Sequence, residues 1–164
     1  MACDKIPDII ELDTYNGDYE KYEEIIYSVY LETFEWEKFI WENKPIVQKK
    51  HPEYKDKAAT FWHIISSGSN EQERIPDLRR YERIAWPAFI LKYCKDNCSD
   101  ILMWKNTRRG KTRILLWCKT IKYVVILDER ADFCVFWTAY PIKYKHVEEK
   151  FLKEYNEYKK SLKE

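Results

Sequence analysis

The sequence contains few residues that interrupt or loosen a chain, with 3 Gly and 6 Pro among 164 residues. Long flexible linkers are rich in such residues, so the composition argues against separate modules joined by linkers. No apolar run approaches the roughly 20 residues that a membrane helix needs. The first residues also lack the charged and then apolar pattern of a signal peptide. We therefore expect one cytoplasmic domain that does not bind a membrane.

Several motifs of known chemistry are missing as well. There is no glycine-rich phosphate loop and no Gly-x-Ser-x-Gly nucleophile turn. The number of cysteines is odd and three of them lie inside apolar runs, which favours buried free thiols over disulfides. The cysteines are Cys3, Cys94, Cys98, Cys118 and Cys134. Cys94 and Cys98 lack the spacing and partner ligands of a zinc site, so we expect neither a metal nor another cofactor.

Aromatic residues and an uneven charge distribution are what the sequence has in quantity. Aromatics make up 16% of the chain, with 13 Tyr and 7 Trp. Residues 1–57 carry 8 Lys/Arg and 14 Asp/Glu, whereas residues 58–122 carry 13 Lys/Arg and 6 Asp/Glu. The basic middle third is compatible with a localised site for an anionic ligand. An uneven but merely solvated surface is the alternative explanation.

Hydrophobic spacing predicts the elements of the first half. Residues 18–34 have apolar positions at helical spacing, with Asp18 as the N-cap. Short strands are predicted near residues 39–41 and 46–48. A helical pattern over residues 78–93 is split or kinked by Pro87.

The second half has the clearest pattern. Four short runs rich in Val, Ile, Trp and Phe alternate with connections short enough for hairpins. The runs cover residues 101–105, 113–119, 123–127 and 133–140. An apolar stripe over residues 147–162 predicts a helix that packs on this sheet. The expected fold is α+β, with N-terminal helices, a four-stranded antiparallel β-meander and a C-terminal helix. Residues 1–57 would form an acidic helical extension and residues 58–164 the core of a single domain.

His63 and a run of arginines are candidate site residues. His63 lies next to a small-residue loop, and histidine is the natural proton shuttle near neutral pH. A packed core histidine is the competing interpretation. Arg79 and Arg83 are four apart, so a helix places them on one face, and Arg80 and Arg83 are also neighbours on a helix. Arginine binds phosphate oxygens through two parallel hydrogen bonds. An exposed helix face paired with nearby acids would show the same pattern.

Two further groups belong to the predicted meander. Lys111 and Arg113 lie in its basic first hairpin, which could hold an RNA backbone or only protect a sheet edge. Thr138 and Tyr140 end its last strand, and residues two apart point to the same face of a sheet. The hydroxyls could position a phosphate or form a simple cross-strand polar pair.

In combination, these segments resemble the phage-associated branch of the barnase–EndoU–colicin–RelE-like (BECR fold) nucleases. The segments that carry the resemblance are residues 61–64 (FWHI), 74–86 (RIPDLRRYERIAW), 124–130 (VVILDER), 138–140 (TAY) and 153–155 (KEY). The resemblance covers about residues 58–160, and it depends on the order of the segments more than on any one of them. It implies helices followed by a four-stranded antiparallel sheet, a nuclease-like core over residues 58–164.

The resemblance also implies a function, that of a toxin-like or phage-linked endoribonuclease that needs no metal. The ribose 2′-OH would attack the adjacent phosphate and leave a 2′,3′-cyclic phosphate. His63 would be the base or acid, Arg79, Arg80 or Arg83 the phosphate clamp, and Arg113 with Lys111 would bind the backbone. Thr138 and Tyr140 would position the scissile group. Implied partners are RNA, with tRNA among the candidates, and an antidote or immunity protein.

A different class of function fits the same sequence. The aromatic surplus and the acidic first third could instead form the binding surface of a non-catalytic interaction or inhibitor protein. Convergence of His63, the arginines, Thr138 and Tyr140 in space would favour the enzyme, and their dispersal would favour the binding protein.

Overall fold

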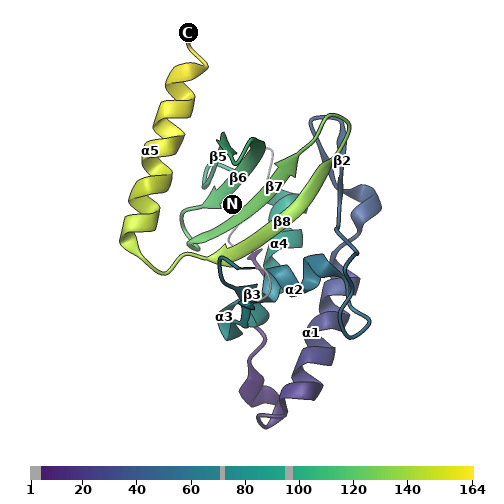
Figure 1. Cartoon of the computed structure of the whole chain (residues 1–164). Helices are drawn as coiled ribbons and strands as arrows, with labels where there is room; N and C mark the ends of the chain where they lie inside the picture. The colour runs from purple at the N-terminus through teal and green to yellow at the C-terminus, as the bar shows by residue number, and fades with distance from the viewer. Residues whose placement is uncertain (1–4, 71–72, 95–97) are drawn as a thin grey trace.

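The computed structural model describes residues 5–70, 73–94 and 98–164. Within these residues the helices are α1 (Tyr19–Thr33), α2 (Ala59–Ile65), α3 (Leu78–Glu82), α4 (Trp86–Phe89) and α5 (Lys145–Ser161), with 3-10 turns η2 (Leu12–Tyr15) and η3 (Trp36–Lys38) and a π-helical turn η5 (Ile90–Cys94). The strands are β1 (Ile40–Trp41), β2 (Lys44–Val47), β3 (Ser66–Ser67), β4 (Ile75–Pro76), β5 (Ile101–Arg108), β6 (Lys111–Cys118), β7 (Tyr123–Glu129) and β8 (Cys134–Pro141). The expected α+β class, with helices before and after the sheet, is confirmed (Figure 1).

Helix α1 forms where the sequence predicts it. The Asp18 carboxylate accepts a hydrogen bond from the Lys21 backbone N–H at 3.1 Å and so satisfies one of the unpaired donors of the first turn. Tyr22, Ile26 and Tyr30 are spaced by four residues and are fully buried. The helix therefore presents a continuous aromatic and aliphatic stripe to the core.

The helical segment after residue 77 is divided, as expected. Asp77 caps α3 by accepting from the Arg79 N–H at 3.0 Å, and α3 ends at Glu82. Pro87 lies in the first turn of α4, where a missing N–H leaves no hydrogen bond unmade. The chain thus turns between two short helices just before the proline.

The predicted meander is present, but it is part of a larger sheet. Strands β5, β6, β7 and β8 pair antiparallel in sequence order. Strand β2 then adds to β8 in parallel, with Ile46 opposite Cys134, and β1 pairs with β2. The result is a mixed six-stranded sheet in the order β1-β2-β8-β7-β6-β5, which corrects the expectation of a four-stranded antiparallel sheet. The two extra strands are only 2 and 4 residues long, and the pairing of β2 with β8 joins segments far apart in sequence, which local patterns do not encode.

The sheet curls so that its two edges approach each other. Lys105 on edge strand β5 lies 3.4 Å from a Glu42 carboxylate oxygen in the turn between β1 and β2. The same ammonium group is 3.2 Å from the Glu129 carboxylate on β7, and Lys44 is 3.4 Å from Glu129 on its other side. This chain of opposite charges spans the sheet at one end and accompanies the strong twist expected of a curled sheet.

The concave face of the sheet holds the main core. Helices α1 and α2 contribute side chains that pack with alternate residues of β6, β7 and β8, among them Leu116, Val125 and Phe136. Trp86 on α4 contacts the buried ring of Tyr123 with ring centroids 5.4 Å apart. Burial of these large side chains is the main source of stability for this layer.

Helix α5 covers part of the opposite face, apart from the other helices (Figure 1). Its Phe151 packs edge-on against Trp104 of β5 and Trp117 of β6, with ring centroids 5.2 and 5.8 Å away. Trp104 also donates its indole N–H to Glu154 of α5 at 2.9 Å. Edge-to-face aromatic pairs of this kind add to the stabilisation that area burial provides.

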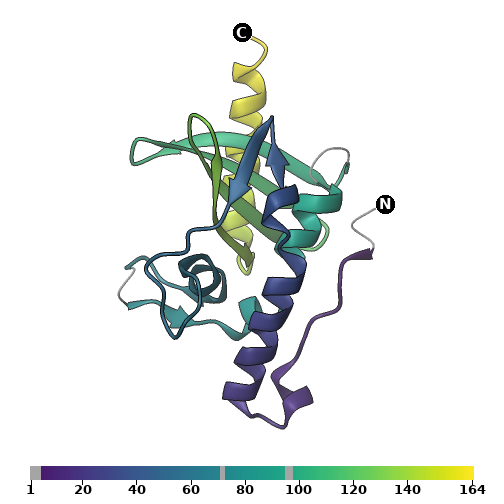
Figure 2. The same ribbon diagram turned by 90° about the vertical axis from the view of Figure 1, so that its right-hand side faces the viewer.

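Residues 5–18 run beside α1 and hold it to α3 and α4 (Figure 2). The Pro7 carbonyl accepts from the Trp86 indole at 2.7 Å, and the Ile10 N–H donates to the Glu82 carbonyl at 2.9 Å. The Tyr22 hydroxyl donates to the Ile10 carbonyl at 2.6 Å. The segment around Pro7 and Ile10 is therefore tied to the helices by hydrogen bonds.

The cysteines that the structure describes lie in the core or at its border. Cys118 and Cys134 are buried, and burial raises the pKa of the Cys134 thiol. Cys98 is half-buried, whereas Cys3 and the side chain of Cys94 lie outside the described residues. Across the residues that the structure describes, every helix is too short or too polar to cross a membrane.

Two isoleucines test whether strand β2 belongs to the stable core. Ile46 is fully buried and Ile40 is 49% exposed. Ile46→Ala should lower the free energy of unfolding by about 2–5 kcal/mol because it leaves a cavity in the core. Ile40→Ala, the matched control, should change it by less than about 0.5 kcal/mol. Urea unfolding followed by circular dichroism measures both, and equal midpoints would contradict the assignment.

Candidate active site

An irregularity in strand β8 organises the candidate site. Leu127 of β7 pairs with Phe136, but the next residue along, Ile126, pairs with Thr138, so Trp137 is an extra residue in β8. Such a bulge turns side chains away from the regular alternation. Phe136 packs into the main core and Trp137 against the α5-side cluster, and after the bulge the alternation is shifted by one residue, so that Ala139 packs into the main core and Tyr140 against the α5-side cluster.

Trp137 brings two ionisable side chains together. The His63 ring of α2 lies 4.8 Å from the indole, measured between ring centroids. The Arg113 guanidinium of β6 lies 4.9 Å from the same indole, in cation–π geometry. The Thr138 hydroxyl, next in the chain, is 3.5 Å from the His63 carbonyl oxygen, to which it donates. Three of the predicted site residues therefore meet around one tryptophan.

Tyr140 extends this group toward α3. The Arg80 guanidinium lies over the Tyr140 ring, 4.9 Å from its centroid. Burial raises the pKa of the Tyr140 hydroxyl, and the positive charges of Arg80, Arg108 and Arg113 only partly oppose that rise. The hydroxyl is accordingly neutral near pH 7 and can donate a hydrogen bond.

The guanidinium groups at the site are incompletely solvated. Burial lowers the pKa of Arg80, and the positive charge of Arg74 lowers it further. Burial likewise lowers the pKa of Arg113, to which Arg108 and Arg109 add. Asp128, directly opposite Arg113 in the sheet, and Asp77 near Arg80 offset part of this charge. A group of guanidiniums in such surroundings favours an anion.

Arg74 and Arg80 also have a structural role at the end of α2. Arg74 donates to the carbonyls of His63 at 2.9 Å and Gly68 at 2.8 Å, and to the Ser66 hydroxyl at 3.0 Å. Arg80 donates to the Ser66 carbonyl at 2.6 Å. The last carbonyls of a helix have no partner inside it, and these two arginines supply the missing donors.

The structure separates the remaining predicted residues from this cluster. Arg79 is exposed on α3, and Lys111 is exposed at the tip of the β5–β6 hairpin. Arg83 donates to Glu82 at 3.1 Å and to the Arg79 carbonyl at 3.1 Å, and lies over Trp86 at 5.0 Å. His63, Arg80, Arg113, Thr138 and Tyr140 thus come together, whereas Arg79, Arg83 and Lys111 do not join them.

Two members of the cluster were missed from the sequence. Trp137 is one of several aromatic residues in a strand whose two faces are both covered, so the sequence carries no signal that sets it apart. Arg108 belongs to the basic first hairpin of the meander, where nothing in the sequence distinguishes it from its basic neighbours, yet its charge acts on both Tyr140 and Arg113.

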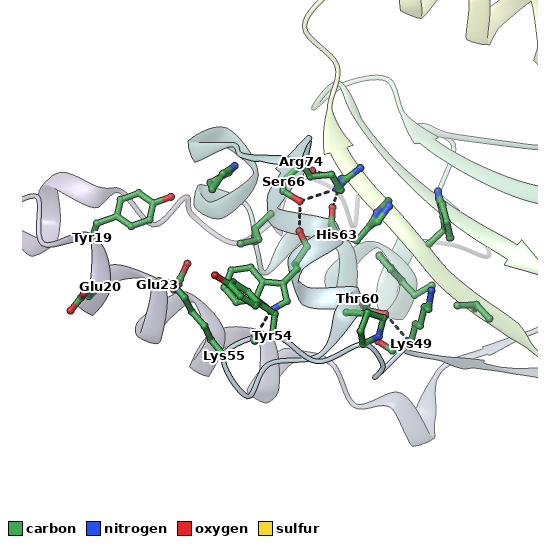
Figure 3. Close-up of a pocket in the computed structure, with 18 residues that line it drawn as sticks. Tyr19, Glu20, Glu23, Lys49, Tyr54, Lys55, Thr60, His63, Ser66 and Arg74 are labelled. Atoms are coloured by element: carbon green, nitrogen blue, oxygen red, sulfur yellow. Dashed lines mark hydrogen bonds between the residues drawn. The ribbon is translucent and has the colours of Figure 1, made fainter. Parts of the chain in front are cut away.

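A cavity of about 670 Å³ adjoins the cluster. His63 and Arg74 form one end of it, and Tyr19, Glu20 and Glu23 of α1 line the other (Figure 3). Trp137, which also lines the cavity, lies against His63. The space between them is lined largely by aromatic and aliphatic side chains. The size lies in the usual range for small-ligand pockets.

No protein-family model, curated protein or solved structure matches the chain. The resemblance to BECR-fold nucleases therefore stays a prediction. Among the described residues, no group of three or more His, Cys, Asp or Glu side chains is placed to hold a metal ion.

Alanine variants of Arg80 and Arg79 test whether Arg80 stabilises the end of α2. Arg80→Ala removes the hydrogen bond to the Ser66 carbonyl and the contact with Tyr140, and should lower the free energy of unfolding by about 1.5–3 kcal/mol. Arg79→Ala, on the exposed face of the same helix, should change it by less than about 0.5 kcal/mol. Urea denaturation compares the two, and a loss of similar size in both variants would refute the capping role of Arg80.

Proposed function

We propose that the protein is a toxin-like or phage-linked endoribonuclease that cleaves RNA without a metal ion, through attack of the ribose 2′-OH on the adjacent phosphate. The observation that supports this most directly is the convergence of His63, Arg80, Arg113, Thr138 and Tyr140 around the bulge of β8. These side chains come from α2, α3, β6 and β8, so tertiary packing brings them together.

Arginine and tyrosine have complementary roles in this proposal. The guanidinium of Arg113, with Arg108 beside it, would bind the phosphate and stabilise the extra negative charge that develops on its oxygens. Trp137 offers a ring on which a base can stack. Because Arg80 is engaged by the Ser66 carbonyl and by Tyr140, its main role would be to fix the tyrosine ring.

The reaction would proceed by internal displacement at phosphorus. His63 would accept the 2′-OH proton while the 2′ oxygen bonds to phosphorus. The bond between phosphorus and the 5′ oxygen would break, and Tyr140, whose raised pKa keeps it protonated, would donate a proton to the leaving oxygen. The products would be a 2′,3′-cyclic phosphate and a 5′-hydroxyl. RNA, including tRNA, is the proposed substrate, and an antidote or immunity protein is the proposed protein partner.

A non-catalytic binding protein is the second candidate. Arg74 and Arg80 donate hydrogen bonds to backbone carbonyls, as arginines with a structural role do, and this favours a role in stability over one in catalysis. Ile75 and Leu78 nearby are 68% and 41% exposed, and exposed apolar side chains are frequent at protein interfaces.

Cleavage of total RNA in the presence of EDTA tests the first candidate. The wild-type protein should release fragments that end in 2′,3′-cyclic phosphate. His63→Gln should slow cleavage by about 10²–10⁴-fold, and Arg113→Ala by about 10²–10³-fold. Tyr140→Phe keeps the ring under Arg80 and removes only the hydroxyl. If this variant loses as much of the cleavage rate as the other two, the hydroxyl proton of Tyr140, and not its ring, is needed for cleavage.

Lys159→Ala is the control for net charge, because Lys159 is exposed on α5 and outside the cluster. It should cleave at the wild-type rate. If the wild-type protein leaves RNA intact, or if the His63 and Tyr140 variants cleave as fast as Lys159→Ala, the nuclease is refuted and the binding protein is favoured.

A further inference from the structure

The cavity next to the site has two chemically different ends. At one end, His63 and Trp137 are shared with the candidate active site. At the other end lie the carboxylates of Glu20 and Glu23 on α1, a segment outside the region that resembles nucleases (Figure 3). A molecule that enters from the active site would therefore meet aromatic walls first and carboxylates last.

The aromatic wall is held in place before any ligand binds. The Trp62 indole N–H donates to the Tyr54 carbonyl at 2.8 Å, and the Tyr54 ring meets the indole edge-on at 5.3 Å. Lys55 lies 5.5 Å from the Tyr54 ring centroid. A fixed, flat wall loses little conformational entropy when a planar ligand stacks on it.

Glu23 is also oriented in advance. The buried Tyr81 hydroxyl donates to Glu23 Oε1 at 2.8 Å. Burial raises the pKa of Tyr81, and the hydroxyl therefore remains a donor to the carboxylate at all ordinary pH values. Glu23 itself is half-buried, so its negative charge is directed at the cavity from a fixed position.

We propose that this cavity binds one unstacked base of a single-stranded RNA, and that Glu23 selects guanine. The proposal rests on the function proposed above, since it places the base beside the phosphate held at Arg113. Single-stranded RNA is commonly recognised through splayed bases that stack on aromatic side chains. Guanine has two N–H donors side by side on its Watson–Crick edge, which a carboxylate can accept. Uracil has one N–H between two carbonyl oxygens, and these oxygens would face the carboxylate unfavourably.

Binding of GMP and UMP, measured by isothermal titration calorimetry, tests the base directly. The two nucleotides share ribose and phosphate, so their difference reports on the base alone. The wild-type protein should bind GMP at least about tenfold more tightly than UMP. Trp62→Leu should weaken binding of GMP by about tenfold or more, because stacking on the indole is lost.

Glu23→Gln isolates the carboxylate. Glutamine keeps the size of the side chain and an oxygen that can accept from Tyr81, but it lacks the negative charge. The variant should lose the preference for GMP over UMP while its melting temperature stays at the wild-type value. Glu32→Gln, at an exposed position on the same helix, should keep the preference.

The outcomes separate this proposal from the nuclease. Cleavage of RNA without any preference for GMP in the wild type would overturn the base site and leave the nuclease standing. Binding of GMP that depends on Glu23, in a protein that leaves RNA intact, would support the base site and refute cleavage. If neither nucleotide binds and tetramethylammonium binds instead in a Glu23-dependent manner, the cavity is a cage for cations and the proposal is overturned.

Discussion

The backbone carbonyl oxygen of His63 is the point at which three separate segments meet. It accepts from Arg74 at 2.9 Å, from Arg80 at 3.4 Å and from Thr138 at 3.5 Å. These donors come from the segment before β4, from α3 and from β8. Because a carbonyl at the end of a helix has no partner within that helix, the three donors fix where α2 ends and how it lies against the sheet. The position of the His63 ring over Trp137 follows from that arrangement.

The same contacts explain how several positive charges can be held close together. Arg80 is surrounded by the Ser66 carbonyl, Asp77 at 3.7 Å and the face of Tyr140, each of which stabilises a cation. Arg113 lies over Trp137 and opposite Asp128. The field of these groups extends toward Tyr140, whose hydroxyl burial keeps neutral. The site is thus positively charged, and contacts hold its arginine side chains in place. Such an arrangement suits the binding of an anion in one orientation.

The cavity and the cluster depend on the first third of the chain as much as on the meander. Helix α1 supplies Glu23 at the far end of the cavity and Tyr30 in the main core. Strand β2 pairs with the first residues of β8, and α2 lies against the same strand. Side chains of α1, β1 and β2 belong to the same main core as those of the meander.

The sequence by itself determined the elements that local interactions specify. Asp18 and Asp77 mark helix starts because their carboxylates satisfy backbone donors within three residues. The meander and α5 follow from hydrophobic patterns with periods close to 2 and 3.6 residues. It also singled out five side chains that meet at the site, although on residue type and a family resemblance, without knowledge of their geometry.

Only the tertiary structure decided what depends on long-range contacts. Packing between distant segments sets the parallel pairing of β2 with β8 and the bulge at Trp137. Local sequence patterns carry no information about such packing. Arg79, Arg80 and Arg83 look equivalent on a helix, yet only Arg80 faces Tyr140 and the end of α2. The reason is that a helix face is defined by what packs against it, and that partner belongs to another part of the chain.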